Sequence, residues 1–261
     1  MHFRNKVVFV AGGTTGINFG IAESFVAAGA RVAVLSRKQD KVDAAVAQLK
    51  AKGGEAIGFA ADVRSIEALD AAMAATAAQW GAIDVLISGA AGNFVSEAEN
   101  LSANGFKTVI DIDLLGCFNV MKAAFPHLRK PGAAIVNISA PQSWLPTPMQ
   151  IHVCAAKAGI DQVTRTAAME WGPKGIRVNA IAPGPIEGTE GMSRLAPTPG
   201  AEQAWTDSVP LRRWGTKQEI AQVAQWLCSD EAGYISGVIL PVDGGWSLGG
   251  SSAMSGALLA H

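Results

Sequence analysis

Residues 7–20 read VVFVAGGTTGINFG, an apolar run followed by a glycine-rich turn and the start of a helical segment. The apolar run predicts a buried strand. Gly12 and Gly16 let the backbone turn tightly and approach a pyrophosphate, and the N-terminus of the next helix offers free N–H groups and partial positive charge. In this strand–turn–helix context the stretch predicts a dinucleotide-binding turn, with a tight turn that holds no ligand as the alternative.

Short apolar runs alternate with helical segments along the rest of the chain. Helical periodicity is found in residues 41–50, 66–80 and 155–171, among others. Each right-handed crossover between parallel strands places its helix over the sheet, so repeated alternation covers both faces. We therefore expect an α/β fold, a single domain over residues 1–261 with one doubly wound, seven-stranded parallel sheet and helices on both faces. The expected strands are residues 7–10, 31–35, 56–60, 83–87, 134–138, 177–181 and 238–242.

One stretch, residues 183–210, breaks this alternation. It is rich in glycine and proline and is too long for a simple connection. We expect a mobile lid or substrate loop here, over about residues 184–212.

The composition excludes several classes of protein. With 49% hydrophobic and 16% charged residues, the 261-residue chain can bury enough apolar surface to fold. Its 21 Lys and Arg are scattered and are balanced by 22 Asp and Glu, which argues against a nucleic-acid partner. No apolar run approaches the roughly 18 residues of a membrane-spanning helix. Residues 1–10 contain no export signal, so we expect a cytoplasmic protein without a membrane partner.

The cysteines and histidines give no sign of a metal site. Cys117, Cys154 and Cys228 are odd in number and far apart, which fits reduced thiols. Cys154 as a nucleophile is one interpretation, and a small core residue is the other. The four histidines lack metal-ligand spacing, so no metal is expected.

The end of the second expected strand bears on which dinucleotide is bound. An enzyme that uses NAD would place an acidic residue there, against the ribose hydroxyls. This chain has Ser36, Arg37 and Lys38 instead, and the two cations can pair with a 2′-phosphate. NADPH is therefore the predicted cofactor, with two solvated basic residues as the alternative. Asp62 and Val63, after the third strand, are placed to meet the adenine.

These features, together with four further motifs, are similar to the short-chain dehydrogenase/reductase family over almost the whole chain. The motifs are SGAAG at 88–92, Lys157, PGPI at 183–186 and VDGG at 242–245. The resemblance implies a single Rossmann-like domain that transfers a hydride from a nicotinamide and assembles as a homotetramer. The chain departs from the family at Asn18, where a third glycine is common, and this concerns local geometry more than binding.

The usual proton donor of that family is absent. It is a tyrosine four residues before the lysine, where this chain has Val153, and the family serine falls at Ala140, next to Ser139. The only tyrosine, Tyr234, lies in a segment that we interpret as structural. Reducing a ketone requires a proton on oxygen, whereas hydride addition to a conjugated thioester spreads charge into an enolate whose oxygen needs only hydrogen-bond donors. The missing tyrosine therefore favours reduction of a C=C bond.

Several segments resemble one subgroup of the family, the 2,4-dienoyl-CoA reductases, particularly the peroxisomal type, which also lacks the tyrosine. The resemblance implies NADPH-dependent reduction of a 2,4-dienoyl-CoA, an acyl-CoA substrate, to a 3-enoyl-CoA in the β-oxidation of unsaturated fatty acids. Residues 257–261 are not the usual peroxisomal address, which fits a cytoplasmic setting. The matching segments are AAGNF (90–94), FKTVIDID (106–113), QIH (150–152), EWGP (170–173) and PGPIEGTEG (183–191).

The resemblance also implies roles for four candidate catalytic residues. Lys157 would hold the nicotinamide ribose and add positive potential near the dienolate. Asp113 stands where the family has an asparagine; a buried carboxylate there could carry a proton, or it could make a structural hydrogen bond at a helix kink. Asp243 would orient the water that protonates carbon, although aspartate before glycine is also ordinary turn chemistry. Asn93 and the backbone around Gly92 would offer a donor to the thioester oxygen.

The remaining assignments concern the two ligands. Phe94, Trp144 and Met192 would line an acyl channel or belong to the core. His152 would be a substitute acid or a structural residue. The expected cofactor-binding residues are Gly12, Thr14, Thr15, Gly16, Ile17, Ser36, Arg37, Lys38, Asp62, Val63, Ala90, Ala91, Gly92, Lys157, Pro183, Gly184, Ile186 and Thr189.

Two other functions stay open on the sequence. The chain could reduce or oxidise another acyl-CoA, a ketone, a steroid or an alcohol through a substitute acid. It could also be a relative that binds NADP but has lost turnover.

Overall fold

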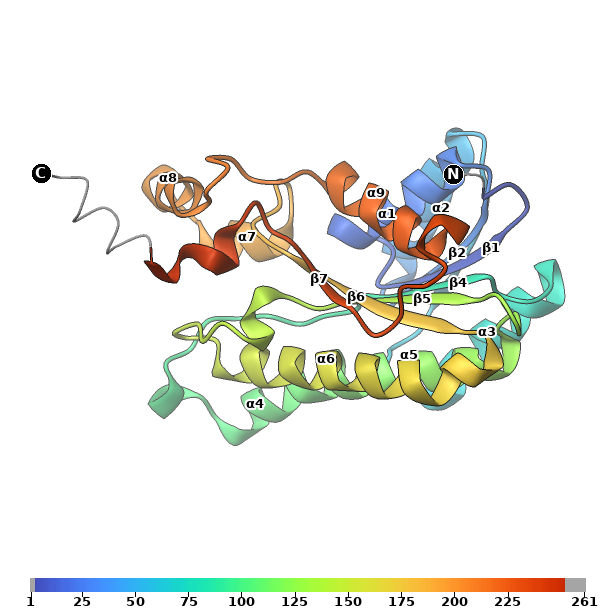
Figure 1. Cartoon of the computed structure of the whole chain (residues 1–261), viewed down its shortest axis with the longest axis horizontal. Coiled ribbons are helices and arrows are strands. Elements are labelled where there is room, and N and C mark those ends of the chain that lie inside the picture. Colours follow the sequence, from blue (N-terminus) through green and yellow to red (C-terminus); the bar gives the residue numbers. More distant parts are fainter. Residues whose placement is uncertain (1–2, 252–261) are drawn as a thin grey trace, which may run out of the picture.

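The computed structural model describes residues 3–251 and confirms the expected single α/β domain (Figure 1). Its seven strands form one parallel sheet in the order β3-β2-β1-β4-β5-β6-β7, so the direction of winding reverses between β1 and β4. The strands are β1 (Val7–Ala11), β2 (Arg31–Ser36), β3 (Glu55–Ala60), β4 (Val85–Ser88), β5 (Ala134–Ile138), β6 (Arg177–Pro183) and β7 (Ile239–Val242).

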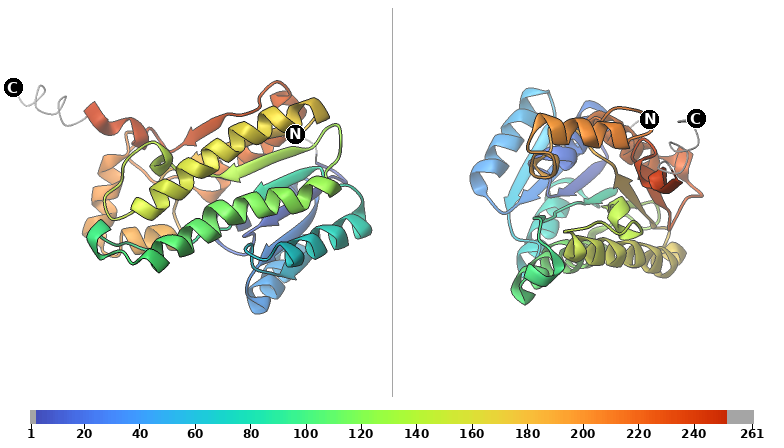
Figure 2. Two further views of the ribbon diagram at one scale, coloured as in Figure 1. Left: turned by 90° about the horizontal axis from the view of Figure 1, so that it is seen from below. Right: turned by 90° about the vertical axis from the view of Figure 1, so that its left-hand side faces the viewer.

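Helices cover both faces of this sheet. Figure 1 shows α1, α2 and α9 on one face and α3, α4, α5 and α6 on the other, and Figure 2 shows α5 and α6 running across the second face. The helices are α1 (Gly16–Ala27), α2 (Gln39–Ala51), α3 (Ile66–Trp80), α4 (Ala103–Val109), α5 (Gly116–Ala124), α6 (Ile151–Trp171), α7 (Glu190–Leu195), α8 (Pro199–Ser208) and α9 (Lys217–Cys228).

The expected boundaries differ from the observed ones in two instructive places. Ile83 makes only an isolated bridge to Leu128, so β4 begins at Val85 rather than at residue 83. Helix α6 begins at Ile151, four residues before the expected start, and it extends no further back because Met149 has a φ of 64° that a helix cannot contain.

Strand β1 is the centre of the packing because neither of its faces meets solvent. Val8 and Val10 belong to the core beneath α1 and α9, while Phe9 and Ala11 belong to the core beneath α3, α5 and α6. This alternation follows from the two-residue period of a strand. A strand buried on both faces has a continuous apolar sequence, which is why residues 7–10 predict it so clearly.

The helical segment from residue 103 to 124 contains a π-helical turn. The turn spans Ile110–Leu115, between α4 and α5, and its only fully buried acid is Asp113. Such turns insert an extra residue into an α-helix and frequently occur at functional sites. Asp113 therefore lies in an irregular turn of this helical segment.

The segment expected as a lid or loop is partly helical. It contains α7 and α8, whose N-caps are Thr189 and Thr198, and each threonine hydroxyl accepts a hydrogen bond from a backbone N–H three residues later. The glycines and prolines around these helices hid them from the sequence pattern. Figure 1 shows both helices beyond the carboxyl ends of the strands.

The structure shows how far the cysteines are buried and whether any helix could cross a membrane. Cys117 is buried, whereas Cys154 is partly exposed and so is not the core residue that we expected. Burial raises the pKa of the Cys117 thiol to about 11 and that of Cys228 to about 12. Within residues 3–251 no helix is long and apolar enough to cross a membrane. Residues 257–261, on which the expectation about a peroxisomal address rests, lie outside the described part of the chain.

Helix α9 begins with a reciprocal pair of capping hydrogen bonds. The Thr216 hydroxyl accepts from the Glu219 N–H (3.1 Å), and the Glu219 carboxylate accepts from the Thr216 N–H (2.8 Å). The neighbouring Arg213 guanidinium lowers the pKa of Glu219 to about 2, so this carboxylate is charged at neutral pH. Its contribution to stability is therefore fully present above the ordinary glutamate pKa and is lost as pH falls below it.

We predict that Thr216→Ala destabilises the protein by about 1 kcal/mol, the usual cost of removing a threonine N-cap. Thr198→Ala removes the equivalent cap from α8, which buries no side chain, and should cost less. Melting temperatures of the two variants and the wild type at pH 7 provide the check. A Thr216→Ala variant that melts with the wild type would contradict this account of α9.

Candidate active site

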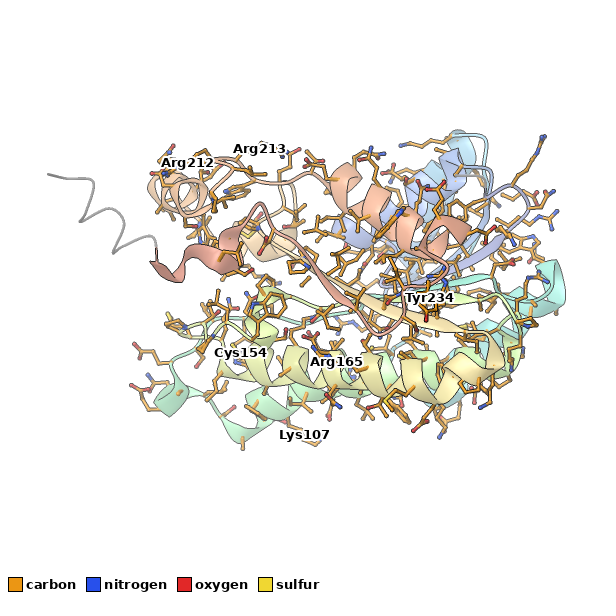
Figure 3. All side chains as sticks on the ribbon, in the orientation of Figure 1. Lys107, Cys154, Arg165, Arg212, Arg213 and Tyr234 are labelled. Carbon is orange, nitrogen blue, oxygen red and sulfur yellow. The ribbon has the colours of Figure 1, made fainter. Side chains whose placement is uncertain are left out.

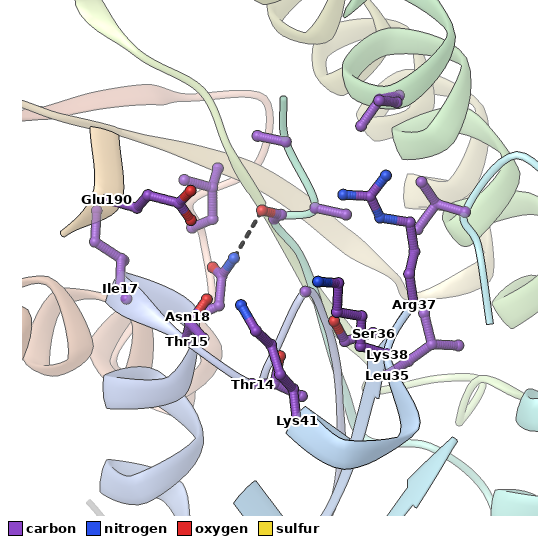
Figure 4. Close-up of a pocket in the computed structure, with 18 of the residues that line it drawn as sticks. Thr14, Thr15, Ile17, Asn18, Leu35, Ser36, Arg37, Lys38, Lys41 and Glu190 are labelled. Atoms are coloured by element: carbon purple, nitrogen blue, oxygen red, sulfur yellow. Dashed lines mark hydrogen bonds between the residues drawn. The ribbon is translucent and has the colours of Figure 1, made fainter. Parts of the chain in front are cut away.

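A pocket of about 370 Å3 lies at the carboxyl edge of the sheet, beyond the ends of β1 and β4, where the direction of winding reverses. Parallel α/β sheets bind their ligands at this reversal point. Figure 4 shows side chains from the turn after β1, the end of β2 and the start of α7 around it. The expected cofactor-binding residues that line the pocket are Gly12, Thr14, Thr15, Gly16, Ile17, Ser36, Arg37, Lys38, Asp62, Val63, Ala90, Ala91 and Thr189.

The glycine-rich turn has the geometry that a phosphate site needs. A Cβ on Gly12 would come within 2.9 Å of the Ala90 backbone, so this close approach requires glycine. Gly16 is the first residue of α1. Its φ of 59° is the reason for glycine here, because a Cβ at this position would have no atom within 4 Å. The Thr15 side chain makes no capping hydrogen bond, so it leaves the first N–H groups of α1 available to an anion.

Asn18 takes a structural role at the position where the family commonly has glycine. Its Nδ2 donates to the Gly89 carbonyl (2.7 Å), the bond drawn in Figure 4, and so joins α1 to the end of β4. A Cβ on Gly89 would come within 2.3 Å of this amide, so the two positions depend on each other. Asn18 Oδ1 is buried at the pocket wall with no protein partner among the described residues. A buried acceptor of this kind fits a ligand that donates a hydrogen bond.

The pocket wall at the end of β2 is basic. Arg37, Lys38 and Lys41 extend into it in Figure 4, and no described carboxylate lies within ion-pair distance of them. The nearby acid, Asp62, is held by the Arg64 guanidinium at 2.7 and 3.0 Å, and this hydrogen bonding lowers its pKa. The positive charge of this wall therefore stays available to a ligand.

Lys157 and Asp113 form a buried ion pair at the end of β5. Their Nζ and Oδ2 atoms are 3.2 Å apart, and their side chains are 8% and 1% exposed. Lys157 also donates to the Ile138 carbonyl (3.1 Å), and the other Asp113 oxygen accepts from the Gly92 N–H (2.7 Å). Asp113 thus makes the structural hydrogen bond that was one of its two expected roles. Because this bond occupies the Gly92 N–H, that amide is not the free donor that we expected for a substrate.

The position of the missing tyrosine holds a buried apolar residue. Val153 is buried in a small apolar cluster with Val109 and Ala156. Tyr234 is fully exposed, and Figure 3 shows it toward the opposite end of α6 from Cys154, the neighbour of Val153. No phenol therefore reaches the Lys157–Asp113 pair.

His152 is buried beside the loop that follows β4. Its Nε2 donates to the Phe94 carbonyl (3.0 Å), and its ring packs against the Phe94 ring with centroids 4.4 Å apart. Its Nδ1 has no partner among the described residues. The Nε2 bond matches the structural interpretation of His152.

No described contact brings Asp243 to the Lys157–Asp113 pair. Its two oxygens accept from the N–H groups of Gly245 and Ser247, both at 2.9 Å, which is the turn chemistry expected as its alternative. Asp243 and Ile186 line a second cavity of about 540 Å3. Gly184 packs against Asp243, since a Cβ there would lie 2.6 Å from the Asp243 Cα.

The three expected substrate residues differ in their exposure. Phe94 and Trp144 are exposed, whereas Met192 is buried in α7. The Asn93 carbonyl accepts a hydrogen bond from the Arg194 guanidinium, so α7 is joined to this loop. The Asn93 Oδ1 is buried without a partner among the described residues.

Sequence reasoning missed several pocket residues. Lys41 carried a usable signal, because it is a third cation one turn into the helix after Lys38. The others had no assigned role at the cofactor, although the segments SGAAG, FKTVIDID and PGPIEGTEG contain four of them. They are Leu35, Ala61, Gly89, Ile112, Ile138, Glu190 and Gly191. Among residues 3–251 there is no cluster of three His, Cys, Asp or Glu side chains that could hold a metal ion.

The comparisons with known proteins cover nearly the whole chain. The family model described as "Enoyl-(Acyl carrier protein) reductase" matches residues 11–247. A protein of Arabidopsis thaliana named peroxisomal 2,4-dienoyl-CoA reductase [(3E)-enoyl-CoA-producing] is 43% identical over 93% of this chain and 84% of its own length. A Bacillus subtilis protein named "Probable 2,4-dienoyl-CoA reductase [(2E)-enoyl-CoA-producing]" is 40% identical over 92% and 96%.

A solved structure of similar sequence has the same fold as this chain. The crystal structure of a short chain dehydrogenase from Bacillus anthracis superposes with a TM-score of 0.83 at 39% identity, covering 93% of this chain and 96% of that one. Fold, family match and relatives coincide over nearly the whole chain. The protein therefore belongs to the short-chain dehydrogenase/reductase family and is an oxidoreductase with a site for a nicotinamide cofactor.

Proposed function

We propose that this protein reduces a 2,4-dienoyl-CoA to a 3-enoyl-CoA with NADPH, in the breakdown of unsaturated fatty acids. The observation that carries the proposal is the buried Val153 beside an intact Lys157–Asp113 pair. A site that lost turnover has no need to keep a buried ion pair, which is costly to desolvate. A site that reduces ketones needs a proton donor where this chain has an apolar cluster. Relatives named as 2,4-dienoyl-CoA reductases support the same reaction.

NADPH supplies a hydride to the substrate. We assign its pyrophosphate to the N-terminus of α1 and its 2′-phosphate to the basic wall of Arg37, Lys38 and Lys41, where no described acid competes for the charge. Lys157 is the residue that would hold the nicotinamide ribose. Its ammonium would also stabilise negative charge that develops on the nearby substrate.

The residues around Lys157 have different tasks in this proposal. Asp113 holds the Lys157 ammonium and the Gly92 N–H, so it fixes the floor of the site. With the Gly92 N–H occupied, the Asn93 amide is the remaining candidate donor to the thioester oxygen. The proton that completes the reaction goes to carbon, and Asp243 would orient the water that delivers it.

Residues 184–212, including α7, would close over the acyl chain beside Phe94, Trp144 and Met192.

We also propose a homotetramer, since two faces of the chain are left uncovered. Phe118, Lys122, Glu170 and Trp171 line a groove of about 430 Å3 between α5 and α6. A second copy related by a two-fold axis can cover its apolar residues and pair Lys122 with Glu170. The second face is β7, an edge strand whose residues remain partly exposed. Two independent two-fold faces generate a tetramer.

The reaction is tested with purified protein, NADPH and a medium-chain trans-2,cis-4-dienoyl-CoA. We expect equal loss of NADPH absorbance and of the dienoyl chromophore, with a product heavier by two hydrogens. Asp113→Asn, which removes the charge but keeps the shape, should lower kcat by tenfold or more, the factor of a lost hydrogen bond to a charged group. NADPH that binds but is not consumed, or that is consumed only with a ketone, would overturn the proposal.

The cofactor preference is tested by the paired variants Arg37→Ala and Lys41→Ala. Each should weaken NADPH binding by about tenfold and leave NADH binding nearly unchanged, because only NADPH carries the 2′-phosphate. Lys52→Ala is the control, since Lys52 pairs with Glu23 outside the pocket. Equal losses for both cofactors, or none for NADPH, would remove these residues from the specificity.

The assembly is tested by Phe118→Asp, which places a charge in the α5–α6 groove. We expect the mass in solution, measured by light scattering, to fall from a tetramer to a dimer. Met169→Asp changes an exposed apolar residue of α6 that does not line the groove and serves as the control. A monomeric wild-type protein would contradict the proposed assembly.

A further inference from the structure

Two charged side chains of α6 hold two consecutive residues at the end of β5. Lys157 Nζ donates to the Ile138 carbonyl at 3.1 Å, and the Ser139 hydroxyl donates to the Asp161 carboxylate. All four residues are buried, and Ile138 lines the cofactor pocket. Asp161 is therefore a second buried acid near Lys157, and the proposed mechanism does not use it.

A pair of uncharged side chains, which begins two residues before Ser139, also joins β5 to α6 and provides a comparison. Asn137 Nδ2 donates to the Thr164 hydroxyl at 2.9 Å, and Thr164 in turn donates to the Ile160 carbonyl at 2.8 Å. This pair joins the same strand to the same helix without any charge. β5 and α6 are therefore also joined by a buried hydrogen bond between uncharged side chains.

Asp161 differs from this neutral pair because it buries an ionisable carboxylate. Burying a charge costs far more than burying an amide or a hydroxyl unless a charge of opposite sign lies nearby. Asp161 follows Lys157 by four residues, which places the two side chains on one face of α6 with their Cβ atoms about 6 Å apart. Lys157 is a buried side chain of opposite charge on that face of α6, and the two charges attract each other.

We propose that Asp161, through Ser139, is a positioning residue for Lys157. It fixes the end of β5, which carries the Ile138 carbonyl that Lys157 binds, and it supplies a second negative charge beside the ammonium. Ser139 stands one residue before the position of the family serine, and its hydroxyl turns into the helix instead of toward a ligand. The inference rests on the proposed role of Lys157 in holding the nicotinamide ribose.

The test measures NADPH affinity by cofactor fluorescence, with no substrate present. Asp161→Asn keeps the shape and removes the charge, and it should weaken NADPH binding about fivefold or more and lower kcat about tenfold with little change in the KM for the acyl-CoA. Ser139→Ala should act in the same direction. If Asp161→Asn fails to fold, Ser139→Ala alone decides, since it leaves the carboxylate in place.

A double-mutant cycle separates positioning from general damage. If Asp161 acts through Lys157, Asp161→Asn should have no further effect on NADPH affinity once Lys157→Ala is present. Asp84→Asn is the control: Asp84 is also buried, but it accepts from the Val7 N–H at the amino ends of the strands. That variant should lower the melting temperature without changing NADPH affinity.

Two outcomes would overturn the proposal. One is wild-type NADPH affinity in Asp161→Asn or Ser139→Ala, and the other is an additional full loss when Asp161→Asn is combined with Lys157→Ala. Because binding is measured without turnover, a failure to reduce dienoyl-CoA would count against the proposed reaction and leave this result unaffected.

Discussion

The buried ion pair between Lys157 and Asp113 is the interaction on which the site depends. Through it, four segments meet at one point: α6, the π-helical turn, the loop after β4 at Gly92, and the end of β5 at Ile138. Removing one partner of such a pair leaves an uncompensated buried charge, which is strongly destabilising. The geometry of the catalytic end is therefore fixed by electrostatics, whereas the two apolar cores on either side of β1 fix the sheet behind it.

The sequence predicted the parts of this structure that local patterns encode. The strands are mostly apolar runs because their sheet is covered on both faces, and residues 66–80 show the period of α3 directly. Helices α7 and α8 were missed because each is short and set among glycines and prolines. The partners of Asn18 and Asp161 were invisible for another reason: Asn18 bonds to a residue 71 positions away. Contacts of that kind follow from the fold and leave no local motif.

The chemistry follows from what occupies the tyrosine position. An apolar cluster around Val153 offers no proton to a carbonyl oxygen, while the ammonium of Lys157 and the Asn93 amide can stabilise negative charge without transferring a proton. This distinction suits a substrate in which charge delocalises over a conjugated thioester and protonation occurs on carbon. The positive wall at Arg37, Lys38 and Lys41 is a separate feature, to which we assign the proposed choice of NADPH.

The most direct test of this account is the position of the transferred hydride. NADPH deuterated at the transferred hydrogen would be used in ordinary water, and the enoyl-CoA product located by NMR and mass spectrometry. We predict deuterium at C5, a solvent hydrogen at C2 and the remaining double bond between C3 and C4. Deuterium on the carbonyl carbon, or a solvent hydrogen at C4 with the double bond left at C2, would contradict the proposed delocalisation and protonation.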